Sequence, residues 1–371
     1  MNRRALLTRI LAGCLVVNEL RRPALADAGV SLTDAAGRTV TVPAPAARII
    51  VTFNYEEFLA VGGPHAFDRV VGYTKTVWYD WRRSIWERYA AVIPKIAQVP
   101  DIGFTENNTF SVEKTVALKP DLMIVPRWMF TEIGQNVSQI EAAGIPILVI
   151  DYNADQVPTH VVSTLALGQV LGADARARQL AALYASKVAD VQARVARARR
   201  PRPKVYLELG QDGPATYGNT YGNDFWGALI ETAGGNNIAA GKITSAAPLN
   251  PEYVIAADPD YIFITGSTWP GSPQSVAMGF GVSPELTNAR LKAYLTRPGW
   301  NTLTAVKTGR VYAIHHGIAR TLFDFAGMQF IAKAMYPTQF ADVDPEASMR
   351  TYFASYLPVQ YDGTWMLQLR R

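Results

Sequence analysis

A short phrase occurs twice in this chain with its key residues at the same offsets. "SVEKTVALKPDLMIV" spans residues 111–125, and "NPEYVIAADPDYIFI" spans residues 250–264, 139 positions later. Each copy has a Glu, an Ala four residues on, a Pro-Asp seven residues on and then an apolar run. Because proline ends helices and short apolar runs enter sheets, each copy predicts a helix, a break and a buried strand. The repeat therefore predicts two related α/β lobes.

Further apolar runs alternate with amphipathic or turn-rich segments from Arg48 onward, which is typical of mainly parallel sheets covered by helices. The candidate strands of the first lobe are "RIIVTF", "RVVGY", "DLMIVP" and "PILVID", and those of the second lobe are "KVYLELG", "DYIFITG" and "RVYAIH". A chain of 371 residues, of which 49% are hydrophobic, is long enough and apolar enough to fill two cores.

Residues 173–199 predict one long helix between the lobes. Their apolar side chains recur at helical spacing, at Leu180, Leu183, Tyr184, Val188, Val191 and Val195. Asp174 is placed to cap the start of this helix, and Pro201 and Pro203 to end it. About 26 residues at about 1.5 Å each give a rod of roughly 39 Å, which reaches from one lobe to the next. We therefore expect a first lobe at 27–172, an interdomain helix at 173–200 and a second lobe with C-terminal helices at 201–371.

The first 26 residues are predicted to be an export signal. A basic "MNRR" precedes the apolar "ILAGCLVV", and small residues at Ala24 and Ala26 suit cleavage after Ala26. "NRRALLT" also resembles a twin-arginine signal, and "LAGC" ending at Cys14 resembles a lipoprotein box. We favour a cleaved, soluble periplasmic product over a lipid-anchored one or a disordered cytosolic tail. Cleavage after Ala26 removes the single cysteine, which excludes disulfides and Cys-based zinc sites.

The formal net charge of +5 arises mostly in this segment, which holds five arginines and one glutamate. The rest of the chain is near neutral and has no basic stripe interleaved with aromatic residues, so we do not expect a nucleic-acid partner. An enzyme is the lower-ranked alternative, because the sequence contains no nucleophile elbow, phosphate loop or zinc-protease helix motif.

Several motifs together resemble the periplasmic binding proteins of ABC importers for iron-siderophores, haem and cobalamin. They are "LTDAAGRTVTVPAPAARII", "VPDIG", "SVEKTVALKPDLMIV", "LALGQVLGADARARQLAALY", "ETAGGNNIA", "NPEYVIAADPDYIFI" and "VKTGRVYAI", and they cover roughly residues 31–315. The resemblance implies two Rossmann-like lobes joined by a single long helix, with a ligand cleft between them. It also implies that Glu113 and Glu252 lie on the outer rims and meet arginines of an inner-membrane permease, where carboxylate–guanidinium pairs would orient the docked protein.

The ligand site is expected in the strand-end loops, because open α/β folds bind ligands at the carboxyl ends of their strands. Arg and Lys there would neutralise an anionic chelate, and Trp and Tyr would cover its apolar faces. The candidate ligand contacts are Tyr55, Tyr73, Lys75, Trp78, Trp81, Arg82, Arg127, Trp128, Tyr217, Tyr221, Trp269, His315, His316 and Arg320. Plainer interpretations stay open, with Tyr217 and Tyr221 as turn residues and Arg82 on a solvated helix face.

This mixture of cationic and aromatic side chains favours a ferric chelate, namely a siderophore, over a bare cation. Haem is the nearest alternative, and its candidate axial ligands are Tyr217, Tyr221, His315 and His316. Cobalamin stays open, as does a molybdate-type oxyanion held by Arg82, Arg127 or Arg320 with backbone amides.

Neighbouring side chains on a strand point to opposite sides, so at most one of His315 and His316 is expected to face the cleft. No spaced cluster of His, Asp and Glu predicts a metal site built from protein ligands alone. We therefore expect a monomeric carrier that is not an enzyme, with no cofactor of its own, a small-molecule metal chelate as ligand and an ABC permease as partner.

Overall fold

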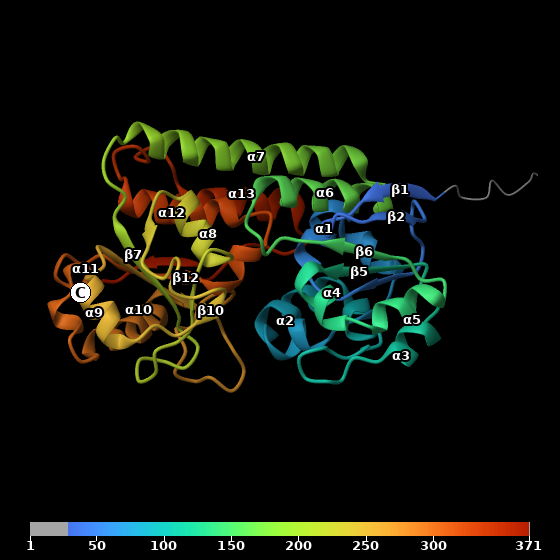
Figure 1. The fold of residues 1–371 in the computed structure, drawn as a ribbon, viewed down its shortest axis with the longest axis horizontal. Coiled ribbons are helices and arrows are strands. Elements are labelled where there is room, and N and C mark those ends of the chain that lie inside the picture. Colours follow the sequence, from blue (N-terminus) through green and yellow to red (C-terminus); the bar gives the residue numbers. More distant parts are fainter. Residues whose placement is uncertain (1–28, 371) are drawn as a thin grey trace, which may run out of the picture.

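The computed structural model describes residues 29–370 and shows two α/β lobes side by side (Figure 1). The first lobe contains a parallel sheet in the order β4-β3-β5-β6, made of β3 (Ile49–Val51), β4 (Val70–Tyr73), β5 (Leu122–Pro126) and β6 (Ile147–Ile150). The second contains a sheet in the order β13-β12-β11-β7-β9, made of β7 (Lys204–Leu209), β9 (Asn236–Asn237), β11 (Tyr261–Gly266), β12 (Val311–His315) and β13 (Met366–Gln368). The edge strand β13 runs antiparallel to β12, while β7, β9, β11 and β12 are parallel to their neighbours. The predicted α/β fold with mainly parallel sheets is confirmed.

Helices cover both sheets. In the first lobe they are α1 (Tyr55–Gly62), α2 (Arg83–Val92), α3 (Val112–Ala117), α4 (Arg127–Ile133), α5 (Asn136–Ala142) and α6 (Val157–Leu171). After the connecting helix come α8 (Trp226–Thr232), α9 (Pro251–Ala257), α10 (Pro284–Lys292), α11 (Thr304–Lys307), α12 (Asp324–Met335) and α13 (Pro345–Tyr356). None of the helices in the described part of the chain combines the length and apolarity needed to cross a membrane.

One long helix, α7 (Asp174–Arg197), runs across both lobes, as Figure 1 shows at the top of the molecule. Its 24 residues span about 36 Å at about 1.5 Å per residue. Leu180, Tyr184, Val188 and Val191 are buried on one face, as their helical spacing predicts. Asp174 is the first helical residue and does not cap the helix, since the N-cap position is Ala173 and no side chain bonds there.

The repeated phrase forms the same structure in both lobes. Lys119 and Asp258 have positive φ angles of 47° and 44°, and each lies after the last residue of its helix and immediately before the proline. The aspartate that follows then binds the start of the neighbouring strand. Asp121 Oδ1 accepts a hydrogen bond from Arg48 N (2.9 Å), and Asp260 Oδ2 accepts one from Lys204 N (2.8 Å). The Pro-Asp pair therefore aligns two adjacent parallel strands in each lobe.

Two features of the fold are not apparent in the sequence. A hairpin of β1 (Val30–Thr33) and β2 (Thr39–Val42) precedes the first sheet, and a second short ladder joins β8 (Thr220–Tyr221) to β10 (Ala246–Ala247).

The late helix α13 lies against α1 of the first lobe and α7, where Arg176 donates to the carbonyl of Tyr356 (3.1 Å). The predicted export signal, with Cys14 and the cleavage point at Ala26, lies outside the described residues.

Candidate ligand-binding cleft

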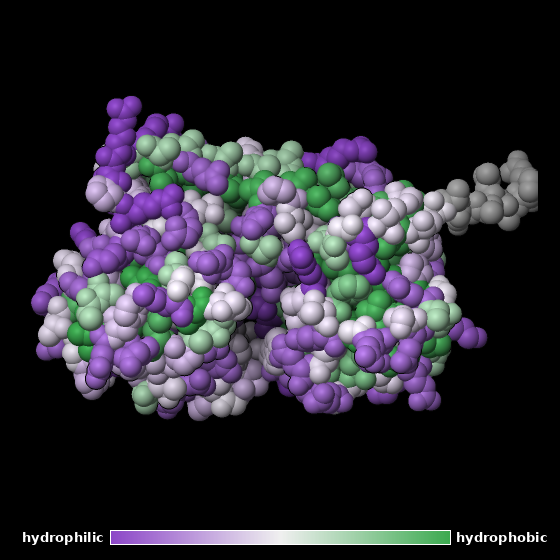
Figure 2. All heavy atoms as spheres, viewed as in Figure 1, coloured by the Kyte–Doolittle hydropathy of each residue, from purple (hydrophilic) through white to green (hydrophobic). Residues whose placement is uncertain are grey.

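A cavity of about 320 Å³ lies between the two lobes, at the carboxyl ends of strands β3, β7, β11 and β12. The first lobe contributes Phe53, Trp81 and Arg82, and the second contributes Leu209, Gln211, Ser267, Trp269, His316, Gly317 and Arg320. Figure 2 shows the hollow between the lobes, with hydrophilic residues in its depth. The cavity therefore lies where parallel α/β sheets place their ligands.

Arg82 carries the positive charge of the first-lobe wall. It lies just before helix α2, where its Nη1 donates to Glu56 Oε1 (3.1 Å) and its Nε donates to the carbonyl of Val77 (3.3 Å). Its Nη2 is buried and has no hydrogen-bond partner among the described residues. Two nitrogens of this guanidinium are thus held in place by its own lobe, while the third is left to a ligand.

Arg320 carries the positive charge of the second-lobe wall, at the end of the 3₁₀ turn His316–Arg320. Its Nη2 donates to His316 Nε2 (3.1 Å), while its Nε is buried without a partner in the described structure. Burial and the nearby charge of Arg82 lower the pKa of Arg320 to about 10, which still leaves it charged at neutral pH. Two cationic groups from opposite lobes therefore line one cavity.

His316 is held as a neutral ring. Because a guanidinium can only donate, the bond from Arg320 requires an unprotonated Nε2, so the hydrogen is on Nδ1. This Nδ1 lies 3.0 Å from Thr265 Oγ1, which can accept it. Burial and the charge of Arg320 lower the pKa of His316 well below its usual value. Both ring nitrogens are engaged, so His316 lacks a free lone pair for a metal.

Aromatic rings form the apolar walls. Phe53 lies between the two arginines, with Arg82 Cζ 5.6 Å and Arg320 Cζ 5.5 Å from its ring centroid. Trp81 packs edge-on against Phe104, and Trp269 lies 5.7 Å from the ring of His316. Cationic donors beside flat apolar surfaces suit an anion that also has an apolar face.

Five of the fourteen predicted contacts line this cavity, namely Trp81, Arg82, Trp269, His316 and Arg320. Tyr55, Tyr73 and Trp78 instead lie in the core of the first lobe, each at most 1% exposed. Tyr55 stacks on Trp78 at 4.2 Å, and its hydroxyl donates to the carbonyl of Thr74 (2.7 Å). Placing these three in the cleft was wrong for this structure, because they turn inward to cover the sheet.

Tyr217 and Tyr221 also serve packing. Tyr217 accepts a hydrogen bond from Trp300 Nε1 (2.7 Å) and lies over Arg297, which forms a buried ion pair with Glu208 (2.7 Å). Tyr221 is 8% exposed and packs against Phe225 behind the cavity wall, where burial raises its pKa. Neither tyrosine lines the cavity.

His315 points away from its neighbour, as expected for adjacent strand residues. It packs on Trp365 at 4.4 Å, and its Nδ1 accepts a hydrogen bond from Gly317 N (3.2 Å). Burial and the charge of Arg82 lower the pKa of His315 to about 3, so the ring is neutral. It borders a separate gap of about 10 Å³, which is too small for a ligand.

The last three predicted contacts lie around the cavity. Trp128 is half-buried behind Phe53, 5.6 Å from it, and Arg127 is exposed at the start of α4. Lys75 is half-buried, with its Nζ 4.4 Å from the ring centroid of Tyr79.

Phe53 and Leu209 are lining residues that the sequence did not single out. Each stands at the end of an apolar run that was assigned wholly to a strand. The signal that identifies them is position, because Leu209 is the last residue of β7 and Phe53 follows the end of β3 by two residues, and the carboxyl ends of parallel strands reach the cleft.

Glu113 and Glu252 lie far from this cavity, in the first turns of α3 and α9. Figure 1 places these two helices in different lobes, on the side of the molecule away from α7. Both glutamates are exposed, and neither forms an ion pair within residues 29–370.

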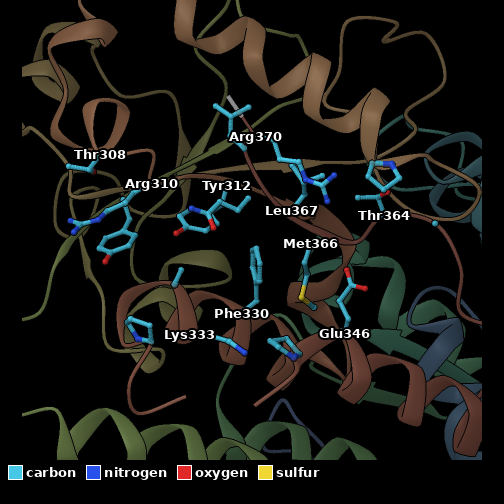
Figure 3. A pocket seen from close by; sticks show the side chains of 18 residues that line it. Thr308, Arg310, Tyr312, Phe330, Lys333, Glu346, Thr364, Met366, Leu367 and Arg370 are labelled. Atoms are coloured by element: carbon cyan, nitrogen blue, oxygen red, sulfur yellow. The ribbon is translucent and has the colours of Figure 1, made fainter. Parts of the chain in front are cut away.

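A larger hollow of about 990 Å³ lies in the second lobe, between strands β12 and β13 and helix α12. Figure 3 shows the aromatic Tyr312 and Phe330 in this hollow, with Arg310, Lys333 and Arg370 around them. All of its lining residues come from the part of the chain after α7. A ligand there would leave the first lobe untouched, so the cavity between the lobes is the better candidate.

Comparison with known proteins agrees with this geometry. Residues 51–316 match the family described as periplasmic binding protein. The chain belongs to this family. The TroA-like periplasmic binding protein FepB from Veillonella parvula is 36% identical, with a TM-score of 0.87 over 92% of this chain and 100% of that one. This periplasmic binding protein is therefore a substrate-binding protein of an ABC transporter, a class that delivers small-molecule ligands to an inner-membrane permease.

Two curated relatives cover most of the chain. The uncharacterized ABC transporter substrate-binding lipoprotein YvrC of Bacillus subtilis is 24% identical over 84% of this chain and 87% of its own length. The molybdate-binding protein MolA of Haemophilus influenzae is 25% identical over 96% of this chain and 97% of its own length. Members of the family are periplasmic or lipid-anchored, and for this chain cleavage after Ala26, the twin-arginine route and a lipid at Cys14 stay predictions.

Proposed function

We propose that the cleft captures a small anionic ligand, a ferric chelate of the siderophore type, for delivery to an ABC importer. The observation that carries this proposal is the pair of half-buried arginines from opposite lobes, Arg82 and Arg320, each with a buried, unpaired guanidinium nitrogen at one cavity. A ligand with two anionic groups could accept from both arginines. It would thereby hold the two lobes in a closed arrangement. The permease could then distinguish the loaded carrier from the empty one by this arrangement.

The charge of the cavity argues against a bare cation as ligand. No carboxylate is among the described residues that line it, and Glu56 offsets only the charge of Arg82. Arg320 has no ion-pair partner within residues 29–370, and His316 is neutral. The site therefore keeps a net positive charge in a setting shielded from water, where attraction of an anion is strong.

The size of the cavity favours a compact ligand. At about 320 Å³ it lies at the lower end of ligand pockets and equals about ten water volumes. A tetrapyrrole has far more atoms than this space holds, and the same limit restricts a ferric chelate to a small one. None of Tyr217, Tyr221 and His315, three of the candidate axial ligands, lines the cavity. A molybdate-type oxyanion is the second candidate, favoured by the cavity size and by the likeness to a molybdate-binding protein along nearly the whole chain.

Titration of the purified protein tests the proposal, because Trp81 and Trp269 in the cavity wall report binding by their fluorescence. The probes are a carboxylate-type and a catecholate-type ferric siderophore, haemin, cyanocobalamin and sodium molybdate. We expect saturable quenching by a ferric chelate, and a loss of affinity of about 30-fold or more in Arg82→Gln and in Arg320→Gln. Arg127→Gln is the matched control, because Arg127 is exposed outside the cavity.

Each outcome decides between the candidates. Saturation by molybdate alone, with the same dependence on the two arginines, would establish the oxyanion in place of the chelate. Equal loss in Arg127→Gln, or binding that ignores Arg82 and Arg320, would overturn the assignment of the site. Thermal melts of all three variants show whether a loss reflects unfolding.

We further propose that Glu113 and Glu252 dock the carrier on its permease. In the repeated phrase the Pro-Asp pair has a structural purpose in both lobes, whereas the exposed glutamate forms no ion pair within residues 29–370. Arginines on the permease would pair with one glutamate on each lobe and so set the docked orientation.

A further inference from the structure

Three buried side chains meet on the side of the molecule where α6, α7 and α12 pack together, which we call the hinge side. Asp155 precedes α6, His160 lies in α6 and Asp324 is the first residue of α12. One ligand atom from each lies within 4.8 Å of the other two, and the exposed fractions of the three residues are 5%, 0% and 0%. None of them lines the cavity between the lobes. We call these three residues the hinge cluster.

The hydrogen bonds of His160 determine which of its nitrogens carries the hydrogen. Its Nδ1 lies 3.2 Å from the carbonyl oxygen of Gln156, and a carbonyl can only accept. Nδ1 is therefore the donor, and in the neutral ring Nε2 keeps its lone pair. This Nε2 lies 3.3 Å from Asp324 Oδ2 without forming a hydrogen bond. Two lone pairs at this distance repel unless a proton or a metal ion lies between them.

The ring and the carboxylate are both held in place. Tyr184 stacks on His160 at 4.6 Å, and Tyr152 packs edge-on against it at 5.1 Å. The hydroxyl of Tyr184 also donates to Asp324 Oδ2 (3.2 Å). Metal-binding histidines and carboxylates are commonly oriented in this way, by a carbonyl on the second ring nitrogen and a donor on the carboxylate.

Three of the four carboxylate oxygens in the hinge cluster lack the partners that buried charges need. Both oxygens of Asp155 and Oδ1 of Asp324 are buried without a hydrogen-bond partner within residues 29–370. Unpaired carboxylates in a dry interior are costly, so the hinge cluster calls for a cation.

We propose that Asp155, His160 and Asp324 bind a divalent transition-metal ion that joins the two lobes on the hinge side. One imidazole and two carboxylates suit Zn²⁺ or Mn²⁺. Two ligands with bonds of about 2.1 Å at a tetrahedral angle are about 3.4 Å apart, close to the 3.3 Å between His160 Nε2 and Asp324 Oδ2. The metal would be part of the carrier and separate from the ligand that it transports.

Metal analysis of the full protein tests this proposal. The protein is stripped with EDTA, dialysed and titrated with Zn²⁺, and bound metal and Tm are measured. We expect about one equivalent of tightly bound Zn²⁺, and a rise in Tm of about 5 °C at a Zn²⁺ concentration about a hundredfold above Kd. Co²⁺ in the unaltered protein should give visible absorption bands, a readout that does not depend on any variant.

The variants His160→Gln and Asp155→Asn should lose the bound equivalent and the rise in Tm. His65→Gln is the matched control, because His65 and Asp68 form an exposed pair that could bind metal adventitiously. Arg82→Gln should retain the metal, which separates this site from ligand capture. Stripped native protein that binds no more Zn²⁺ than His160→Gln, or gives no Co²⁺ bands, would show that a proton fills the role of the cation.

Discussion

At the scale of single residues, buried charges in this protein fall into paired and unpaired groups. Glu208 and Arg297 satisfy each other with two bonds, of 2.7 and 2.8 Å, inside a shell of aromatic rings. Arg82, Arg320 and the hinge cluster keep polar atoms without partners within residues 29–370. Buried polar atoms are almost always bonded, so these unpaired charged groups are the candidates for contact with a ligand or an ion.

Glu57 gives a test at this scale. It is buried on α1, and its Oε1 accepts a hydrogen bond from Leu322 N of the other lobe (3.2 Å). Burial and the charge of Glu56 raise its pKa from 4.5 to about 8. The folded protein therefore holds a proton that the unfolded chain releases above about pH 4.5. The stability that this proton contributes is fully present below that pH and is lost as the pH rises through about 8.

We predict that stability falls less between pH 5 and pH 8 in Glu57→Gln than in the native protein. The difference in the free energy of unfolding should be on the order of a few kcal/mol, and it should appear as a flatter dependence of Tm on pH. Glutamine keeps an oxygen for Leu322 N but cannot ionise. Thermal melts across this range, with the exposed Glu87→Gln as control, measure the effect. Identical slopes in the native protein and Glu57→Gln would show that Glu57 does not titrate there.

At the scale of elements, the repeated unit of helix, Pro-Asp and strand contains residues that serve the fold and residues that are free to serve a partner. Asp121 and Asp260 make the same backbone bonds in their lobes, which explains the Pro-Asp pair without reference to a partner. The close approach of α6 to α7 is likewise structural, because a Cβ at Gly168 would come within 2.3 Å of the Ala177 side chain. Glu113 and Glu252 are the matched charged residues of the repeat that are exposed and form no ion pair within residues 29–370.

Charge reversal tests these two glutamates. We predict that the double variant Glu113→Arg, Glu252→Arg abolishes uptake by cells while ligand affinity of the purified protein changes less than about twofold, since both sites lie outside the cleft. Glu285→Arg is the matched control, because Glu285 is also exposed in a helix first turn. Each reversal should cost only about 0.3–1 kcal/mol of stability through the helix dipole. A large loss of affinity would contradict docking as their function.

At the scale of the molecule, the lobes are joined by more than α7. Ser84 Oγ lies 2.7 Å from Thr268 Oγ1 across the cleft, and Arg88 of α2 pairs with Asp362 of the second lobe. Asn54 Nδ2 donates to the carbonyl of Arg320 (3.2 Å) beneath the cavity. Contacts on both sides of the cleft restrict how far the lobes separate, so ligand binding should involve a small closure.

We predict a radius of gyration of about 20 Å for the mature protein, which falls by no more than about 1 Å when ligand saturates it. Small-angle X-ray scattering with and without the ligand identified by titration measures this change. Ser84→Ala is a variant that removes one contact across the cleft without touching α7 or the hinge side. A decrease of several ångströms in the native protein would indicate a wide hinge motion and would contradict the restraint argued from these contacts.

The sequence alone predicted the elements that depend on local pattern. Apolar runs located the seven main strands, helical spacing located α7 within two residues at either end, and strand-end position selected Trp81, Arg82, Trp269, His316 and Arg320 for the cleft. These properties arise over one turn of helix or one strand, so neighbouring residues carry the signal.

Only the tertiary structure decided where individual side chains point. Tyr55 and Trp78 follow strand ends as Trp81 does, yet they turn into the core, because the direction of an aromatic ring depends on which helix packs over it. The hinge cluster joins residues 155 and 160 to residue 324, and no local pattern links them. Their meeting requires α6, α7 and α12 to pack together, and packing between distant segments is the part of a fold that short-range propensity does not encode.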